Sequence, residues 1–304
     1  MRILITGGSG YLATSVSLLL SKTFKIVLLT RNPKKIAKIK RKNINIVKIS
    51  DYNINQIRKY IKGCDYIIHF VGLNKSESNR EPKKALNVKL RSTKALIYLA
   101  NKYKIKKFIY ISSMQVYKNY INKKKITENN IVTLASGYNK SHIMAERMIL
   151  NSKKSFEYYI LRPSSIFGFY FFSQSKELIY TILNNFCYQA KLENIIRISN
   201  PNTVRNFLPL KIFVKFINYI LSNKIRSKNK IINIGYKSLS LEEVSKMIAK
   251  RFFILNKSKI KILMKRKIKN KIPKFIYKSN IKNLRFRKKM FVGEIDNFLK
   301  NIKR

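Results

Sequence analysis

Short apolar runs alternate with amphipathic stretches through the first half of the chain. Strands buried on both faces of a sheet need apolar side chains at nearly every position, whereas strands with one wet face alternate. The runs here are nearly continuous, and stretches with helical spacing separate several of them, most clearly at 82–103. The pattern predicts βαβ units and an α/β fold with a doubly wound parallel sheet. The predicted strands are 2–6, 24–30, 43–49, 65–71, 107–113 and 157–163.

The alternation weakens after residue 165. We therefore predict a main domain over 1–165 and a smaller C-terminal lobe over 166–304, with segments near 204–216 and 231–235 returning to the main domain. The polar stretch 118–134 is expected to be a loop. Further expected elements are strands at 231–235 and 259–264 and helices at 240–250 and 293–303.

A glycine cluster follows the first predicted strand and opens the first predicted helix. In "ITGGSGYLA" the spacing is Gly7-x-x-Gly10-x-x-Ala13. This spacing lets the backbone approach a pyrophosphate at a helix N-terminus, where free N–H groups and the helix dipole favour anions. We interpret the loop as a dinucleotide site on a Rossmann sheet, with Tyr11 and Leu12 beside it; a plain tight turn is the alternative.

The end of the second predicted strand bears on the choice of cofactor. An acidic residue there would bind the adenosine ribose hydroxyls, but the chain has Thr30 and Arg31. A guanidinium can pair with a 2′-phosphate. The sequence therefore favours NADP(H) over NAD(H), unless Arg31 is only one more basic residue in a basic chain.

The chain carries a formal net charge of +53, from 66 Lys and Arg residues against 13 Asp and Glu residues. Such a field attracts nucleic acid, anionic membranes and phosphorylated ligands. However, the basic residues run through the whole chain, and Lys, Ile and Asn are abundant together, as codon bias in an A+T-rich genome produces. We favour the codon-bias interpretation and expect no specific nucleic-acid partner.

Cysteine content and hydropathy argue against several classes of protein. Cys64 and Cys187 are too few for a disulfide framework or a zinc cluster, which fits a reduced, cytoplasmic setting. The first apolar run is broken by glycines and lacks the features of a signal peptide. No uninterrupted run approaches the roughly 18 residues of a membrane span. We expect no bound metal and no membrane attachment.

Several further motifs follow the glycine loop in order along the chain. Asp51 lies in "ISDYN", Asn87 in "ALNVKLRSTKALI" and Ser113 in "FIYISSMQVY". Tyr138 and His142 lie in "GYNKSHIMAE", and the landmarks "LRPSSIFG", "TVRNFLPL" and "INIGYKSLSLEEV" follow. Together with "TGGSGYLA", these segments resemble the extended short-chain dehydrogenase/reductase family of NAD(P)-dependent nucleotide-sugar epimerases, dehydratases and reductases.

The resemblance implies a catalytic group of Ser113, Tyr138 and His142. Tyr138 would exchange a proton with a sugar hydroxyl or carbonyl while the nicotinamide exchanges the hydride. Ser113 would hydrogen-bond the same oxygen. His142 stands four residues after the tyrosine, where the family has a lysine that binds the cofactor ribose and lowers the tyrosine pKa.

The resemblance also implies the remaining contacts. Asp51 falls where the family contacts the adenine, and Asn87 matches a buried helix asparagine. Ser165, at a position that is often asparagine, and Arg205, which suits a diphosphate, would bind the nucleotide-sugar substrate. A homodimer through the helices near 82–103 and 137–153 is implied as well.

Departures from the family pattern limit the expected chemistry. His142 can donate hydrogen bonds to a ribose, but an unperturbed imidazole is mostly neutral at pH 7 and would not activate the tyrosine. Lys140 projects to another helix face. Met114 and Gln115 replace the Asp–Glu pair of sugar 4,6-dehydratases, which argues against elimination of water.

Three hypotheses follow from these residues. The favoured one is a nucleotide-sugar reductase or epimerase that works by hydride transfer. The second is a catalytically impaired NAD(P)-binding protein of the same fold, serving as a sensor or an assembly subunit. The third is a nucleic-acid-associated protein that binds through its positive charge.

Overall fold

The computed structural model describes residues 1–118, 124–169, 181–223, 230–265, 274–277 and 289–302. The chain forms two compact units. Unit 1 contains residues 1–118, 130–162 and 218–232, and unit 2 contains residues 119–129, 163–217 and 233–304. Of the two segments expected to return to the main domain, 204–216 lies in unit 2, whereas the beginning of 231–235 lies in unit 1 together with residues 218–230.

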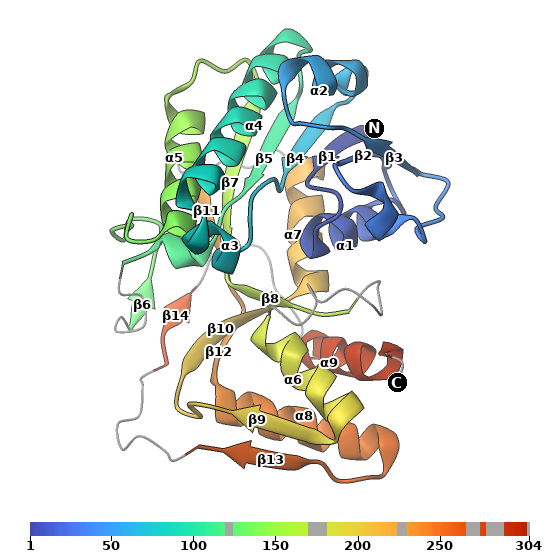
Figure 1. The fold of residues 1–304 in the computed structure, drawn as a ribbon, viewed down its shortest axis with the longest axis vertical. Helices are drawn as coiled ribbons and strands as arrows, with labels where there is room; N and C mark the ends of the chain where they lie inside the picture. The colour runs from blue at the N-terminus through green and yellow to red at the C-terminus, as the bar shows by residue number, and fades with distance from the viewer. Residues whose placement is uncertain (119–123, 170–180, 224–229, 266–273, 278–288, 303–304) are drawn as a thin grey trace. The chain divides into compact units, whose positions relative to one another are not determined.

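Unit 1 is built on a seven-stranded sheet in the order β11-β7-β5-β4-β1-β2-β3, within the described residues (Figure 1). All pairings from β7 across to β3 are parallel. This confirms the predicted α/β fold with a doubly wound parallel sheet. The strands are β1 Arg2–Thr6, β2 Lys25–Thr30, β3 Ile44–Lys48, β4 Tyr66–His69, β5 Lys107–Ile111, β7 Glu157–Pro163 and β11 Ile231–Ile234.

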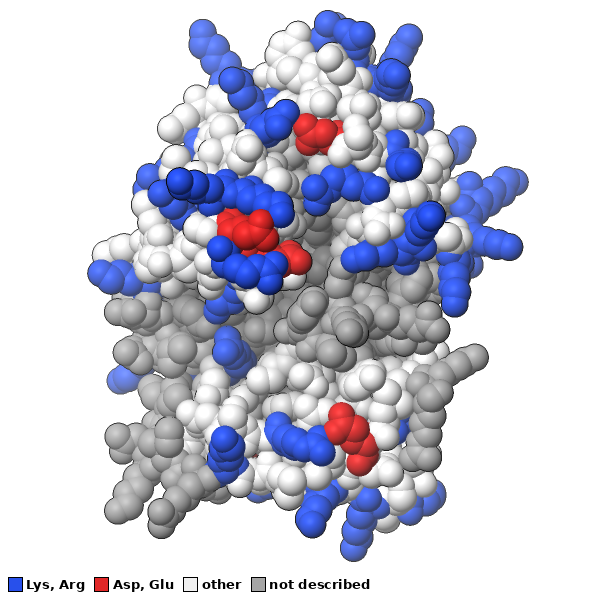
Figure 2. All heavy atoms as spheres, viewed as in Figure 1, with Lys and Arg blue, Asp and Glu red and all other residues white. Residues whose placement is uncertain are grey.

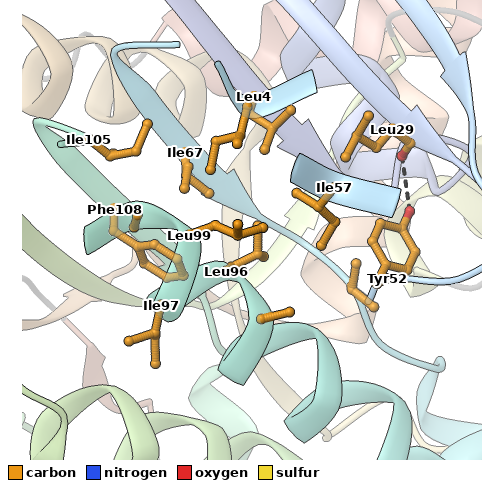
Figure 3. Packing of buried hydrophobic residues seen from close by; sticks show 14 of the residues in the cluster. Leu4, Leu29, Tyr52, Ile57, Ile67, Leu96, Ile97, Leu99, Ile105 and Phe108 are labelled. Atoms are coloured by element: carbon orange, nitrogen blue, oxygen red, sulfur yellow. Dashed lines mark hydrogen bonds between the residues drawn. The ribbon is translucent and has the colours of Figure 1, made fainter. Parts of the chain in front are cut away.

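Helices lie on both faces of this sheet, because its central strands are apolar on both sides. On one face Leu4, Ile67 and Phe108 join a buried cluster with side chains of α2 and α4 (Figure 3). Ile3 and Ile5 point to the opposite face and are also fully buried, and α1 packs there against β1 and β2. The helices are α1 Tyr11–Leu20, α2 Ile54–Ile61, α3 Lys75–Arg80, α4 Pro82–Lys102 and α5 Gly137–Asn151.

Unit 2 contains a three-stranded sheet, β12-β10-β8, and the two-stranded pairs β13-β9 and β14-β6. Ser240 and Glu243 form a capping box at the start of α8, as the Ser cap and first-turn acids predict. The short strand β6, Lys125–Ile126, lies within 118–134, so the expectation that this stretch is only a loop was wrong.

The strands of unit 2 are β6 Lys125–Ile126, β8 Ser165–Phe167, β9 Ile195–Ile198, β10 Val204–Pro209, β12 Lys237–Ser240, β13 Lys261–Met264 and β14 Ile276–Tyr277. The helices are α6 Ile182–Glu193, α7 Leu210–Ser222 (which continues into unit 1), α8 Leu241–Asn256 and α9 Lys289–Asn301.

Basic side chains are spread over the surface. On the face drawn in Figure 2, Lys and Arg residues occur across the described surface and do not gather on one element. A search of the described helices finds none with the length and hydropathy needed to cross a membrane.

Glu294 on α9 is a buried carboxyl group in unit 2. Its side chain is 1 % exposed, and Oε1 accepts from the Lys211 backbone N–H at 3.3 Å. Its Oε2 atom has no hydrogen-bond partner among the residues that the structure describes. Burial raises the pKa of Glu294 from 4.5 to about 7, although the Lys211 ammonium opposes the rise. The folded state therefore binds this proton more tightly than the unfolded state.

We predict that Glu294→Gln stabilises the protein at alkaline pH. The Glu294 contribution is most favourable below pH 4.5 and is lost as the pH rises through about 7, with a cost of about 3 kcal/mol above that value. Denaturant unfolding at several pH values should show that the substitution removes this decline. Glu193→Gln, at an exposed carboxylate, is the control. Parallel pH profiles for wild type and Glu294→Gln would contradict the prediction.

Candidate active site

The glycine loop between β1 and α1 packs tightly against β2. Gly7 has a φ of +77°, which favours glycine. The Gly8 N–H donates to the Leu29 carbonyl at 2.9 Å, and a Cβ at Gly8 would lie only 2.7 Å from Leu28 Cγ. Gly7 is needed for its backbone conformation and Gly8 for packing, so both glycines serve the protein's own fold.

Gly10 differs, because little of the protein occupies the space beside it. A Cβ there would meet the Gly7 carbonyl at 3.3 Å and, apart from Gly10's own chain neighbours and helix backbone, no other atom of the described residues within 4 Å. Gly10 is the N-cap of α1 and supplies no side-chain cap. The N–H groups of the first helical turn have no partners within the helix, so an anion can approach them. This cradle fits a cofactor pyrophosphate.

Tyr52, a residue that the sequence analysis did not single out, holds the loop to β2. Its hydroxyl accepts from the Gly7 N–H at 2.9 Å. It also donates to the Leu29 carbonyl at 2.9 Å, the bond drawn in Figure 3. Burial raises the pKa of Tyr52 to about 12, so the hydroxyl remains a donor at neutral pH. The loop is thereby fixed before any ligand binds.

The residues proposed to contact the adenosine moiety occupy three different environments. Thr30 is fully buried, and its Oγ1 accepts from the Asn32 N–H at 3.1 Å. Arg31 is exposed directly after β2. Asp51 is partly exposed and pairs with Arg91 on α4 at 3.1 Å. Arg31 and Asp51 are therefore accessible to a ligand, whereas the Thr30 side chain serves the local turn.

Tyr138 is held at the start of α5 by close backbone packing. The Ser136 side chain caps the helix by accepting from the Asn139 N–H. A Cβ at Gly137 would lie 2.2 Å from the Ser78 carbonyl, and Asn79 Oδ1 accepts from the Tyr138 N–H at 3.3 Å. The segment α3 therefore fixes the position of this tyrosine. Lys140 is exposed, as expected from its helix face.

The structure brings Ser113 and Tyr138 together. Ser113 follows β5, and its Oγ accepts from the Gln115 N–H at 3.2 Å. Burial raises the pKa of the Tyr138 phenol, and a hydrogen bond with Ser113 lowers it in part. The phenol therefore stays protonated at neutral pH and needs a nearby positive charge to act as a base.

A buried ion pair anchors the strand and helix that carry these two residues. Glu146 on α5 accepts from Arg162 Nε on β7 at 3.0 Å and from Ser112 Oγ at 2.5 Å, and a second bond joins Arg162 to Glu146 at 2.5 Å. The two charged side chains are at most 4 % exposed. Removing either partner would leave an unpaired buried charge, so the pair fixes α5 relative to β5 and β7.

His142 lies beside Tyr138, with the two ring centroids 4.6 Å apart. Its Nδ1 is 3.1 Å from the Tyr110 hydroxyl, and its Nε2 is 3.0 Å from Lys89 Nζ. When Lys89 is protonated it can only donate, and a donation to Nε2 then leaves the ring proton on Nδ1. Burial, followed by the charge of Lys89, lowers the pKa of His142 well below its ordinary value. His142 is neutral, and both of its ring nitrogens are engaged within the protein.

Lys89 on α4 is the residue of this site that the sequence analysis missed. Asn87, which we expected to be buried, is exposed, and the buried position belongs to Lys89 two residues later. One signal was available: Lys89 lies in line with Ala85, Ser92 and Leu96, the buried stripe of the helix. A lysine at such a position usually has a structural or functional partner.

The two residues proposed to bind substrate lie together in unit 2. Ser165 is on β8 and Arg205 is on β10, the central strand of the three-stranded sheet. Ser165 pairs with Phe207 along β10, two residues after Arg205. Both side chains are half-buried.

Comparison with known protein families shows which family the chain belongs to. The model of the NAD dependent epimerase/dehydratase family matches residues 3–235, which is most of the chain. The chain belongs to this family. The match extends from the first strand through the glycine loop, Ser113, Tyr138 and Arg205, so it confirms the resemblance inferred from the motifs.

Relatives agree with this assignment. The dTDP-D-glucose 4,6-dehydratase of Dictyostelium discoideum is 26 % identical over 243 residues, which are 73 % of this chain and 49 % of the relative. The chain thus spans about half the length of that protein.

Solved structures of epimerases share the fold. UDP-N-acetylglucosamine 4-epimerase from Methanobrevibacter ruminantium M1, in complex with UDP-N-acetylmuramic acid, superposes with a TM-score of 0.81 at 19 % identity, covering 98 % of this chain and 97 % of the epimerase. UDP-glucose 4-epimerase from Thermus thermophilus, in complex with NAD, gives a TM-score of 0.73 at 16 % identity, covering 98 % and 99 %.

We predict that alanine substitutions at two loop glycines of this family member act differently. Gly8→Ala should lower the free energy of unfolding by about 1–3 kcal/mol, because its Cβ would overlap Leu28 and the Leu29 carbonyl. Gly10→Ala should cost less than about 1 kcal/mol, since it has a φ of −78° and an open side. Denaturant unfolding without cofactor measures both. Equal losses would show that Gly10 is also required for packing.

Proposed function

We propose that the protein is an NAD(P)-dependent oxidoreductase that acts on a nucleotide sugar by hydride transfer, as a reductase or an epimerase. The observation that carries the proposal is the proximity of Ser113, directly after β5, to Tyr138 at the start of α5, where the Ser113 side chain acts to lower the pKa of the phenol. Both residues stand in the same unit as the glycine loop, whose open helix N-terminus fits a dinucleotide.

Each residue has a proposed role. A bound nicotinamide would supply the hydride chemistry. Tyr138 exchanges the proton of the reacting sugar hydroxyl or carbonyl, and Ser113 holds the same oxygen. Arg205 binds the diphosphate of the substrate, for which its fork of N–H donors is suited. Ser165 contributes a hydroxyl to the same ligand.

Elimination of water is a less suitable reaction for this chain, although one relative is a 4,6-dehydratase. Dehydration of a sugar needs an acid and a base beside the tyrosine. Here Met114 is buried and apolar, and Gln115 does not ionise. Epimerisation or reduction needs no such additional acid–base pair beside the tyrosine.

NADP(H) is our preferred cofactor, and Arg31 supports it. The guanidinium is exposed immediately after β2, and no carboxylate stands beside it in the sequence. A 2′-phosphate would pair with this group. The family as a whole is described by its dependence on NAD, so the preference for the phosphorylated form rests on this residue.

We predict that NADPH and NADP⁺ raise the melting temperature more than NADH and NAD⁺. A ligand at 100 times its Kd adds about 2.7 kcal/mol to stability. Arg31→Ala should abolish the preference while the NADH response remains, and Gly10→Ala should weaken all four responses. Equal responses of the wild type to all four cofactors would argue against the role of Arg31.

We predict that Tyr138→Phe lowers turnover of the correct nucleotide sugar by about 10²–10⁴-fold, because the proton exchange is lost. Ser113→Ala should lower turnover as well, and both variants should keep cofactor affinity. Steady-state assays on a panel of UDP- and dTDP-sugars, with binding measured separately, check this. Lys140→Ala is the control, since this side chain on the same helix is exposed. Wild-type turnover by Tyr138→Phe would remove the tyrosine from the mechanism.

A catalytically impaired NAD(P)-binding protein is the second candidate. It is favoured by the neutral His142 and by the raised pKa of Tyr138, because together they leave the phenol without its usual activating lysine. Cofactor binding with no turnover on the whole sugar panel would support this alternative.

A further inference from the structure

The Lys89 amine lies in a space that the backbone leaves open for it. Its side chain extends from α4 and is 3 % exposed. A Cβ at Gly72, just after β4, would lie 2.6 Å from Nζ and 2.7 Å from Cε. The glycine therefore provides room for the end of the lysine, whose Nζ lies 3.0 Å from His142 Nε2.

This buried amine lacks a counter-ion of its own. Among the described residues Lys89 makes no ion pair, and the carboxylate that acts on it, Glu146, is already bound to Arg162 and Ser112. Burial lowers the pKa of Lys89 to about 7, and Glu146 offsets only part of this effect. An unpaired buried ammonium is costly, and its place beside Tyr138 and His142 makes it a candidate for a functional role.

We propose that Lys89 supplies the positive charge that the position of His142 lacks, and that this charge acts on Tyr138 through the His142 ring. The proposal rests on the proposed function and adds a residue to it. Lys89 contacts His142, and the His142 ring lies tilted against the Tyr138 ring with the centroids 4.6 Å apart, so the three form a continuous path from α4 to the start of α5. Lys89 is a positioning residue, whereas Tyr138 contacts the substrate.

Other ionisable groups around the amine do not replace its charge. Burial keeps His69 neutral, with a pKa of about 3, and its ring binds Thr6 and Thr93. The Arg162 guanidinium forms an ion pair with the Glu146 carboxylate. The titratable and charged groups facing this cluster are His69 on β4, Tyr110 on β5, Tyr138, His142 and Glu146 on α5, and Arg162 on β7. Among these groups, Lys89 is therefore the cation that is free to act on Tyr138.

The variants remove the positive charge of Lys89, keep it at the same position, or move it to another helix. Lys89→Met removes it at nearly constant size, and Lys89→Arg keeps it. The double variant Lys89→Met/His142→Lys moves it to α5. Gly72→Ala displaces the amine without changing the lysine, and Lys94→Met removes an exposed charge from the same helix as the matched control. Thermal melting first establishes which variants are folded.

Two readouts are measured from about pH 6 to about pH 12, because burial raises the pKa of Tyr138 above the ordinary tyrosine value of about 10. The first is the pH profile of kcat/KM on the active nucleotide sugar. The second needs no turnover: ultraviolet titration of tyrosine in each protein, minus the same protein carrying Tyr138→Phe, isolates one phenol among 18 tyrosines.

Lys89→Met should raise the midpoint of both profiles by about one pH unit, so that activity at pH 7 falls about tenfold and recovers at high pH. Gly72→Ala should move the midpoints in the same direction. Lys89→Arg and the double variant should restore the wild-type midpoint, and Lys94→Met should leave it unchanged.

Unchanged midpoints in Lys89→Met would overturn the proposal. So would a uniform loss of activity at every pH that neither Lys89→Arg nor the double variant restores, because that pattern belongs to a structural residue. If the wild type turns over no nucleotide sugar, the proposed function fails, and the tyrosine titration alone still decides the role of Lys89.

Discussion

Close backbone approach at a few glycines is the constraint on which the rest of this structure depends. Gly8 lies against β2 with no room for a side chain, and Gly137 lies against the carbonyl of Ser78 in the same way. The first contact fixes the start of α1 behind the glycine loop, and the second fixes the start of α5 and hence Tyr138. Both helix starts are thereby set by packing within unit 1 before a ligand arrives, which is the preorganisation that catalysis requires.

The chemistry of the site depends on a positive charge near Tyr138 more than on the shape of the site. Burial raises the pKa of Tyr138, and the nearby Ser113 side chain lowers it only in part. His142 does not relieve this, because it is neutral and engaged on both nitrogens. Lys89 brings an ammonium to the far side of the same ring. On this account the site keeps a cation near the tyrosine, carried by a different helix from the one that the sequence motif indicates.

The apolar runs were sufficient to predict the strands of the parallel sheet, because strands buried on both faces need no polar alternation. The glycine loop was predicted from its spacing between a strand and a helix, and the role of Ser113 came from the family resemblance. Short elements such as α3 and β6 were missed, since they depend on packing rather than on periodicity. Lys89 was missed because one lysine among 66 Lys and Arg residues does not stand out by composition, and only the helix face shows that it is buried. The two side chains that contact His142 come from α4 and β5, at sequence separations of 53 and 32 residues. A pattern in the local sequence cannot predict contacts at such separations.

The most direct test of the account follows the hydride itself. The protein is mixed with an oxidised cofactor and with ring-deuterated UDP-glucose or UDP-N-acetylglucosamine, and the nicotinamide is analysed by mass spectrometry. The account predicts deuterium on the nicotinamide ring with the wild type and none with Tyr138→Phe, although both proteins bind the cofactor. Bound cofactor that gains no deuterium from either sugar, or from a wider panel of labelled nucleotide sugars, would contradict the claim that this chain transfers hydride.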